Sequence, residues 1–228
     1  DSTSQVHVLH SKTQGVLGGA LSGYLTYTRD GQTDGATSTA TSFEDTMNWF
    51  TIGARQAGKL GGLDYRVEYY HQFGDAGTIA NASGYGITGA SDTGDSVDRD
   101  ANMMGIRIGK TFSNKASVTL WYDRLSGVDD EDQADGDWGA FDTMYDTGHK
   151  YYGYMDMYLS RTGAHTNFYG LQDFAIKAKM PINEATTLKA DFHHFRTATN
   201  LEDGDATSLM ASRADAPGEV NSAMDNDL

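Results

Sequence analysis

The residues best placed for chemistry are charged side chains that recur at every second position. The cations of this set are Arg55, Arg66, Arg107, Lys177, Lys179 and Lys189, and its carboxylates include Glu68, Asp123 and Asp191. Guanidinium and ammonium groups pair with carboxylates, so these cations could bind and relay an anionic solute. They could equally pair with carboxylates on neighbouring strands. The sequence leaves both alternatives open.

A second group of charges could hold a metal. The stretch 129–137 offers five aspartates as Ca²⁺ ligands: Asp129, Asp130, Asp132, Asp135 and Asp137. Hard cations prefer several carboxylate oxygens. The stretch lacks the EF-hand order of ligands, so a solvated acidic loop is the stronger alternative. In a third alternative, divalent cations bridge this stretch to surface lipid phosphates.

Catalytic patterns are missing from the sequence. The chain has no cysteine, which excludes thiolate chemistry and cysteine zinc sites. No Ser-His-Asp order or Gly-x-Ser-x-Gly motif occurs. His193 and His194 are neighbours on an expected strand, so they should point to opposite faces and cannot bind one ion together. We therefore expect a protein that is not an enzyme and carries no cofactor other than Ca²⁺.

The composition favours a β-protein. The 228 residues include 27 glycines and 2 prolines, and 11% are aromatic, which argues against disorder. The formal charge of −15 excludes a nucleic-acid partner, because no basic stripe exists. No run of 18 apolar residues occurs, although a transmembrane β-barrel needs none.

Polar and apolar residues alternate over eight stretches, and this pattern predicts eight strands. The clear examples are 63–73, 101–112, 116–125, 169–180 and 186–197, and the weaker ones are 5–12, 19–28 and 47–58. The six cations should face water on one side of the sheet. The apolar residues that should face the other way, toward lipid, include Phe50, Val67, Ile106, Leu120, Ile176 and Phe192.

The links between these stretches alternate in length. Short links fall at 13–18, 59–61, 113–115 and 181–185, and long links at 29–46, 74–100, 126–168 and 198–218. The long links hold 22 of the 32 acidic residues but only 5 of the 17 basic ones. This layout predicts a single domain, an antiparallel up-and-down transmembrane β-barrel with turns on one rim and acidic loops on the other. The segment 126–168 is then one loop, folded over or into the pore, since another strand within it would reverse the order of the rims.

Two segments resemble alginate-export-type outer-membrane proteins. They are IGARQAGKLGGLDYRVEYYHQFGD (52–75) and FDTMYDTGHKYYGYMD (141–156), within a similarity that runs from about Asn48 to Thr197. The resemblance implies a β-barrel of the bacterial outer membrane that passes a polysaccharide or another polar solute. Such barrels have more than eight strands, so we expect this chain to be a part of one. The motif residues His149, Lys150, Tyr152, Tyr154 and Asp156 would then constrict the pore or pack in the loop.

The leading interpretation is therefore an outer-membrane channel for polar or anionic solutes, including oligosaccharides and polysaccharides. Its other partners would be membrane lipid and lipopolysaccharide. The alternative is a soluble or surface-attached β-protein that binds carbohydrate through aromatic, Ca²⁺-binding loops. The two differ in which strand face is exposed. A soluble protein buries the apolar face, whereas a channel in a membrane buries the charged one.

Overall fold

The structure, a computed structural model, describes residues 4–30, 47–78, 96–129, 137–144, 152 and 169–199. These residues form nine strands: β1 (Gln5–Val16), β2 (Gly19–Asp30), β3 (Met47–Leu60), β4 (Leu63–Thr78), β5 (Ser96–Thr111), β6 (Ser117–Leu125), β7 (Asp137–Trp138), β8 (Leu171–Pro181) and β9 (Thr187–Arg196). Among them there is no helix that is long and apolar enough to cross a membrane.

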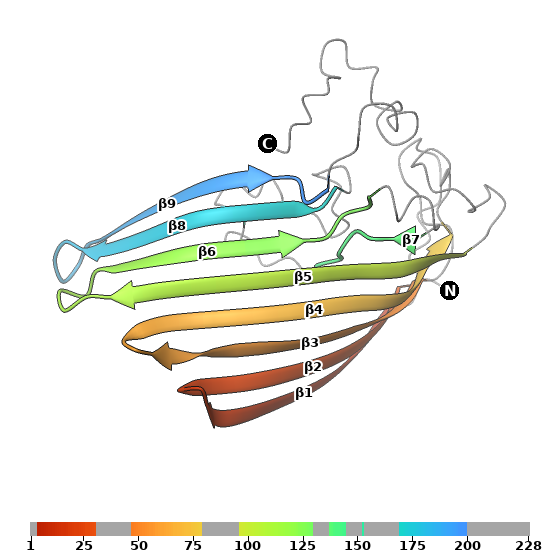
Figure 1. Ribbon diagram of the computed structural model, residues 1–228, viewed down its shortest axis with the longest axis horizontal. Coiled ribbons are helices and arrows are strands. Elements are labelled where there is room, and N and C mark those ends of the chain that lie inside the picture. Colours follow the sequence, from red (N-terminus) through yellow and green to blue (C-terminus); the bar gives the residue numbers. More distant parts are fainter. Residues whose placement is uncertain are drawn as a thin grey trace, which may run out of the picture.

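One sheet contains all nine strands. Eight of them lie side by side in chain order, β1-β2-β3-β4-β5-β6-β8-β9, and each pairs antiparallel with its neighbours (Figure 1). The short strand β7 adds to β5 in parallel, opposite Asp98 and Arg99. The predicted all-β, up-and-down arrangement is confirmed. Within the described residues β1 and β9 are the two edges, so this sheet is not closed into a barrel.

Tight turns connect the strands at one end of the sheet. Gly61 and Gly62 alone link β3 to β4, with φ angles of 58° and 79°. Two consecutive residues with positive φ are typical of a type I′ hairpin turn, which matches the twist of the strands. Glycine adopts this conformation without a steric penalty because it lacks a Cβ atom. The glycine pair therefore fixes the register of this hairpin.

The short turns lie at one end of the sheet, as predicted. Lys59, Lys115 and Glu184 lie at the end where short turns join the strands (Figure 1). At the other end Leu125 is opposite Leu171, so the connection from β6 to β8 leaves and returns on the same side. This pairing agrees with the prediction that the segment 126–168 begins and ends on the same rim. Asp130, which was to test this order of the rims, lies outside the described residues.

Several strands extend further than the alternation indicated, and β1, β4 and β5 do so by four or five residues. β4 continues to Thr78 and β5 begins at Ser96, so the expected long link 74–100 was wrong at both ends. Gly74 and Gly77 have φ angles of 134° and 79°, and the pairing register shifts between Asp75 and Thr78. A bulge of this kind interrupts the two-residue period while pairing continues. Strand β7 was also not predicted, because two residues are too few to show a period.

The faces of the sheet have opposite polarity. We call the face that carries Arg55, Arg107 and Lys177 the inner face, and the other the outer face. Direct pairing of residues places all six predicted cations on the inner face and all six predicted apolar residues on the outer face. The predicted separation of the two sets onto opposite faces is confirmed. Side chains are most exposed on the outer face, where Leu120 is 56% exposed and Phe192 64%.

Candidate functional site: the charged inner face

A buried ion cluster occupies the middle of the inner face. The Arg107 guanidinium lies 3.3 Å from Asp123 Oδ1 and 3.4 Å from Glu68 Oε1. Its central carbon lies 3.4 Å from the centre of the Trp121 ring, and the indole N–H donates to Asp123 Oδ2 at 2.6 Å. Arg107 is 6% exposed, Glu68 3% and Asp123 0%. The guanidinium, the two carboxylates and the indole ring therefore contact one another in place of water.

The register of three strands creates this cluster. Gly105 on β5 lies directly between Glu68 on β4 and Asp123 on β6. A Cβ atom at position 105 would lie 2.9 Å from an oxygen of each carboxylate. Glycine thus lets both acidic side chains close over β5 and reach Arg107, two residues further along. Alternation predicted that these residues share a face, whereas strand pairing decided that they meet.

Arg66 belongs to the same cluster. Its guanidinium lies 2.5 Å from Glu68 Oε2, on its own strand, and its residue is directly opposite Arg107. Glu68 therefore forms ion pairs with two arginines, and its negative charge offsets the repulsion between them. For Arg66 and Arg107 the geometry favours the pairing alternative over the relay of a solute. Arg55 is directly opposite Glu68 on β3, so it belongs to the same face of the sheet.

The three lysines of the site lie nearer the turn end. Lys177 Nζ lies 3.8 Å from Asp191 Oδ2 and 4.4 Å from the centre of the Trp121 ring. Lys179 and Lys189 are directly opposite each other, and both are exposed. Neither makes an ion pair with a carboxylate of the described residues. Like charges that face each other across two strands are destabilising, and an anion between them would relieve this.

A histidine–carboxylate pair escaped the sequence analysis. His193 Nδ1 lies 2.9 Å from both carboxylate oxygens of Asp173, which is 0% exposed. The imidazole also stacks on Phe195, with ring centres 5.3 Å apart. His194 is opposite Phe174 on the outer face, which confirms that the two histidines cannot bind one ion together. The signal for the pair was that His193 and Asp173 both occupy polar faces of expected strands.

Part of the β6–β8 connection packs on the inner face. The Gln72 amide donates to the Asp142 carbonyl oxygen at 2.8 Å and accepts from the Asp142 N–H at 2.9 Å. The side-chain amide of Gln72 thus bonds to both backbone groups of Asp142, as a neighbouring strand would. The two residues are 70 positions apart in the sequence. The Arg99 guanidinium donates to the Ala140 carbonyl oxygen at 3.4 Å and lies over the Trp49 ring. These contacts hold segment 137–144 against β3, β4 and β5.

Apolar residues complete this contact. Tyr152, from the family-like motif, is 8% exposed and belongs to a small core cluster with Ala101, Leu125, Phe141 and Leu171. All four partners lie on the inner face or in the packed segment, so Tyr152 packs against the inner face. The other proposed constriction residues, His149, Lys150, Tyr154 and Asp156, lie outside the described residues, and their role stays a prediction.

The Ca²⁺ ligands are placed only in part. Asp129 follows β6 and Asp137 begins β7, whereas Asp130, Asp132 and Asp135 lie outside the described residues. In the described part of the chain, no group of three His, Asp or Glu side chains could hold a metal ion. Ca²⁺ binding at this stretch therefore stays a prediction.

The ion cluster predicts a large cost for removing its central cation. Arg107→Met should lower the free energy of unfolding by about 3–5 kcal/mol, because Glu68 and Asp123 would stay buried without their partner. Chemical denaturation measures this cost. The matched control is Lys110→Met, an exposed cation on the outer face of the same strand, which should change stability by about 0.5 kcal/mol or less. An equal effect of both substitutions would contradict the central position of Arg107.

The Gln72 contact predicts a local change. Gln72→Leu should raise hydrogen exchange of the amides in 137–144 by about tenfold or more, since both backbone groups of Asp142 lose their partner. Exchange in β6 should stay unchanged. Gln56→Leu is the control, because Gln56 also donates to a backbone carbonyl, that of Val16, but lies far from the segment. Unchanged exchange in 137–144 would show that the segment does not depend on Gln72.

Comparison with known proteins gives one match. The family model described as alginate export matches residues 8–223, nearly the whole chain. No curated protein and no solved structure matches the chain. The match extends the similarity seen in 52–75 and 141–156 to both ends of the sheet. The chain belongs to the alginate export family.

Proposed function

We propose that the chain forms the wall of an outer-membrane channel and that polar or anionic solutes, above all polysaccharides, pass along its inner face. The family is one of transport proteins and not a class of enzymes. Conduction requires a wet, charged surface and a defined opening, and it requires no catalytic group.

The observation that carries the proposal is the reversed polarity of the sheet. Glu68, Asp123 and Asp173 are at most 3% exposed on the inner face, whereas Ile176 and Leu120 are 48% and 56% exposed on the outer face. In water this arrangement would expose apolar surface over several strands at a considerable free-energy cost. In a bilayer the same outer face contacts lipid, and the charged face is the one that needs water and ion pairs.

The same observation disfavours the soluble alternative. A soluble carbohydrate-binding β-protein would bury Leu63, Val67 and Tyr69, yet these side chains are 40%, 47% and 51% exposed. The acidic loops on which that alternative depends lie largely outside the described residues. We therefore retain the channel as the single proposed function.

Within the channel, Lys179 and Lys189 are the cations that we assign to contact with a passing anion. Both are exposed on the inner face, near the turn end, and they repel each other across β8 and β9. Arg66 and Arg107, by contrast, already have carboxylate partners. A polyanion that passes this point would meet two positive charges without breaking an existing ion pair.

Ion selectivity tests this assignment. The double substitution Lys179→Gln and Lys189→Gln should lower the preference of the pore for chloride over potassium, measured as a reversal potential in planar bilayers. A unit charge roughly 10 Å from an ion in water changes its energy by about 0.4 kcal/mol, so each lysine should contribute roughly a factor of two. The expected change is a few-fold, and it should diminish in high salt.

The control for this experiment is Lys115→Gln in the β5–β6 turn, a lysine at the same end of the sheet but outside the strands. It should change selectivity less than either inner-face lysine. Channels whose selectivity is unaffected by the double substitution would refute the role of the two lysines. A native protein, purified with the whole barrel that contains this chain, that forms no channels at all would refute the proposed function itself.

Stability tests the lipid contact of the outer face. Ile106→Lys should cost about 2–4 kcal/mol in a bilayer if the site lies near the midplane, because a charge would then face hydrocarbon. Unfolding by denaturant from lipid vesicles measures the cost. Ile182→Lys is the matched control: Ile182 is 55% exposed but lies in the β8–β9 turn, where a lysine should be tolerated. If Ile106→Lys is harmless, the outer face does not lie in lipid.

A further inference from the structure

The lysines of this chain gather at the turn end of the sheet. Seven of its eight lysines lie in the four short turns or next to them, within residues 12–20, 58–65, 109–118 and 177–191. We call these four ranges the turn-end rim. Its lysines are Lys12, Lys59, Lys110, Lys115, Lys177, Lys179 and Lys189.

The rim is positive, although the whole chain has a formal charge of −15. Its acidic residues are Asp64, Glu184 and Asp191, so seven lysines against three carboxylates leave a net charge of +4. Two of the carboxylates pair within the rim, Asp64 with Lys59 at 2.9 Å and Asp191 with Lys177 at 3.8 Å. The other five lysines make no ion pair with a carboxylate in the part of the chain that the structure describes. Their charge is therefore available to a partner.

These five lysines are also accessible to water. All of them are exposed: Lys12, Lys110, Lys115, Lys179 and Lys189. The neighbouring ion cluster around Arg107 contains two arginines and two carboxylates, so it does not offset their charge. At the opposite end of the sheet the inner face is covered, and Gln72 and Ala101 are 0% exposed there. The rim is thus the accessible end of the inner face.

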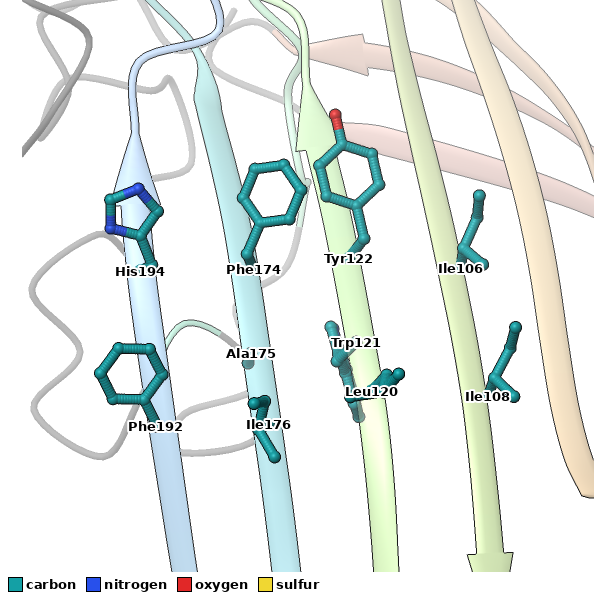
Figure 2. A pocket seen from close by; sticks show the side chains of 10 residues that line it. All are labelled: Ile106, Ile108, Leu120, Trp121, Tyr122, Phe174, Ala175, Ile176, Phe192 and His194. Carbon is teal, nitrogen blue, oxygen red and sulfur yellow. The ribbon is translucent and has the colours of Figure 1, made fainter.

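Membrane lipid does not account for this arrangement. Five of the rim lysines lie on the inner face of the sheet: Lys12, Lys59, Lys177, Lys179 and Lys189. Of the lysines in the rim only Lys110 lies on the outer face. Between β5 and β9 the outer face is instead apolar, with Leu120, Ile176 and Phe192 around a shallow hollow (Figure 2). A partner of the rim therefore approaches from water and not from the bilayer.

The spacing of the lysines fits an extended partner. They occur on strands from β1 to β9, which are seven strand spacings, or about 34 Å, apart along the sheet. In the rim only Lys179 and Lys189 are directly opposite each other, so a small anion could contact few of the lysines at once. A folded protein is also disfavoured, because protein interfaces are depleted in lysine. A flexible chain with many negative charges can contact several of these lysines together.

We propose that the turn-end rim is a capture surface for an extended polyanion. Its lysines attract the polymer from solution and hold several of its charges before the polymer enters the channel. Ammonium groups on flexible stems act as point charges, so they require no fixed geometry in the partner. Attraction of this kind raises the association rate, most strongly at low salt. The inference rests on the proposed function, since it requires an opening at the turn end.

The rate at which a polymer blocks the ion current tests the capture. The native protein, purified with the whole barrel that contains this chain, is studied in planar bilayers at about 0.01 M salt, where the Debye length is about 30 Å. The probes are carboxymethyl dextran and unmodified dextran of equal length, which differ in charge. Ser113→Cys, an exposed position in the β5–β6 turn, identifies the turn side through a thiol reagent that cannot cross the membrane.

The two polymers should differ in how strongly they prefer the turn side. The ratio of the blocking rate from the turn side to that from the other side should be several-fold larger for carboxymethyl dextran than for dextran. Equal ratios for the two polymers would overturn the proposal, because the shape of the channel alone would then explain any preference.

Three lysines outside the proposed ion contact serve as the variant. The triple substitution Lys12→Gln, Lys110→Gln and Lys115→Gln leaves Lys179 and Lys189 in place. It should lower the turn-side blocking rate of carboxymethyl dextran roughly five- to tenfold, since each charge about 10 Å away contributes roughly a factor of two. The difference should disappear at about 1 M salt, where the Debye length is about 3 Å.

Two matched controls separate charge from other effects of substitution. Arginine at the same three positions keeps the charge and should keep the wild-type blocking rate. Glu184→Gln removes the one rim carboxylate that has no lysine partner among the described residues, and it should raise the rate by about a factor of two.

The outcomes distinguish the capture surface from the channel. A glutamine variant that is blocked at the wild-type rate, or an arginine variant as slow as the glutamine variant, overturns the capture surface even if the channel conducts ions normally. A native protein that forms no channels overturns the proposed function and this inference with it.

Discussion

The ion cluster around Arg107 is the interaction on which the polarity of the whole sheet depends. It joins β4, β5 and β6 through Glu68, Arg107 and Asp123, all of which are nearly inaccessible to solvent. Buried charges of this kind are stable only when they are paired, so the three strands must keep one register. A shift of one residue would place these charges on the apolar face and break every pair at once.

This constraint separates the cations of the inner face into two groups. Arg66 and Arg107 pair with buried carboxylates and stabilise the sheet, while Lys179 and Lys189 make no ion pair with a carboxylate of the described residues. A wall needs internal pairing to be stable in a wet interior, and a transport path needs charges that a solute can still reach. The inner face separates its paired arginines and its unpaired lysines along the strands.

The inner face also holds part of the long β6–β8 connection. Gln72 pairs with the backbone of Asp142, and Phe141 and Tyr152 pack with Ala101, so this segment has a defined place on the wall. Polar side chains here replace water as partners of backbone groups, which an irregular segment needs when it is buried. The outer face carries no comparable covering in the described residues. It keeps an apolar surface, consistent with a lipid environment.

The sequence by itself determined the eight long strands, their facing and the ends at which they turn. Alternation is a local property: the opposite faces of Arg66 and Val67 can be read from their own strand, without information about any other strand. Turn residues such as Gly61 and Gly62 are equally local, because their φ angles suit one hairpin type. These features could be predicted, and the family resemblance was carried by the same segments.

The tertiary structure alone decided which residues meet. Glu68 and Asp123 approach each other only because Gly105 lies between them, and Asp173 finds His193 only because β8 pairs with β9. Gln72 and its partner Asp142 are 70 residues apart. Strand β7 and the extension of β4 past Gly74 show no alternation of polar and apolar residues from which a strand could be predicted. Such contacts depend on register and on long-range packing, which a pattern of two residues does not encode.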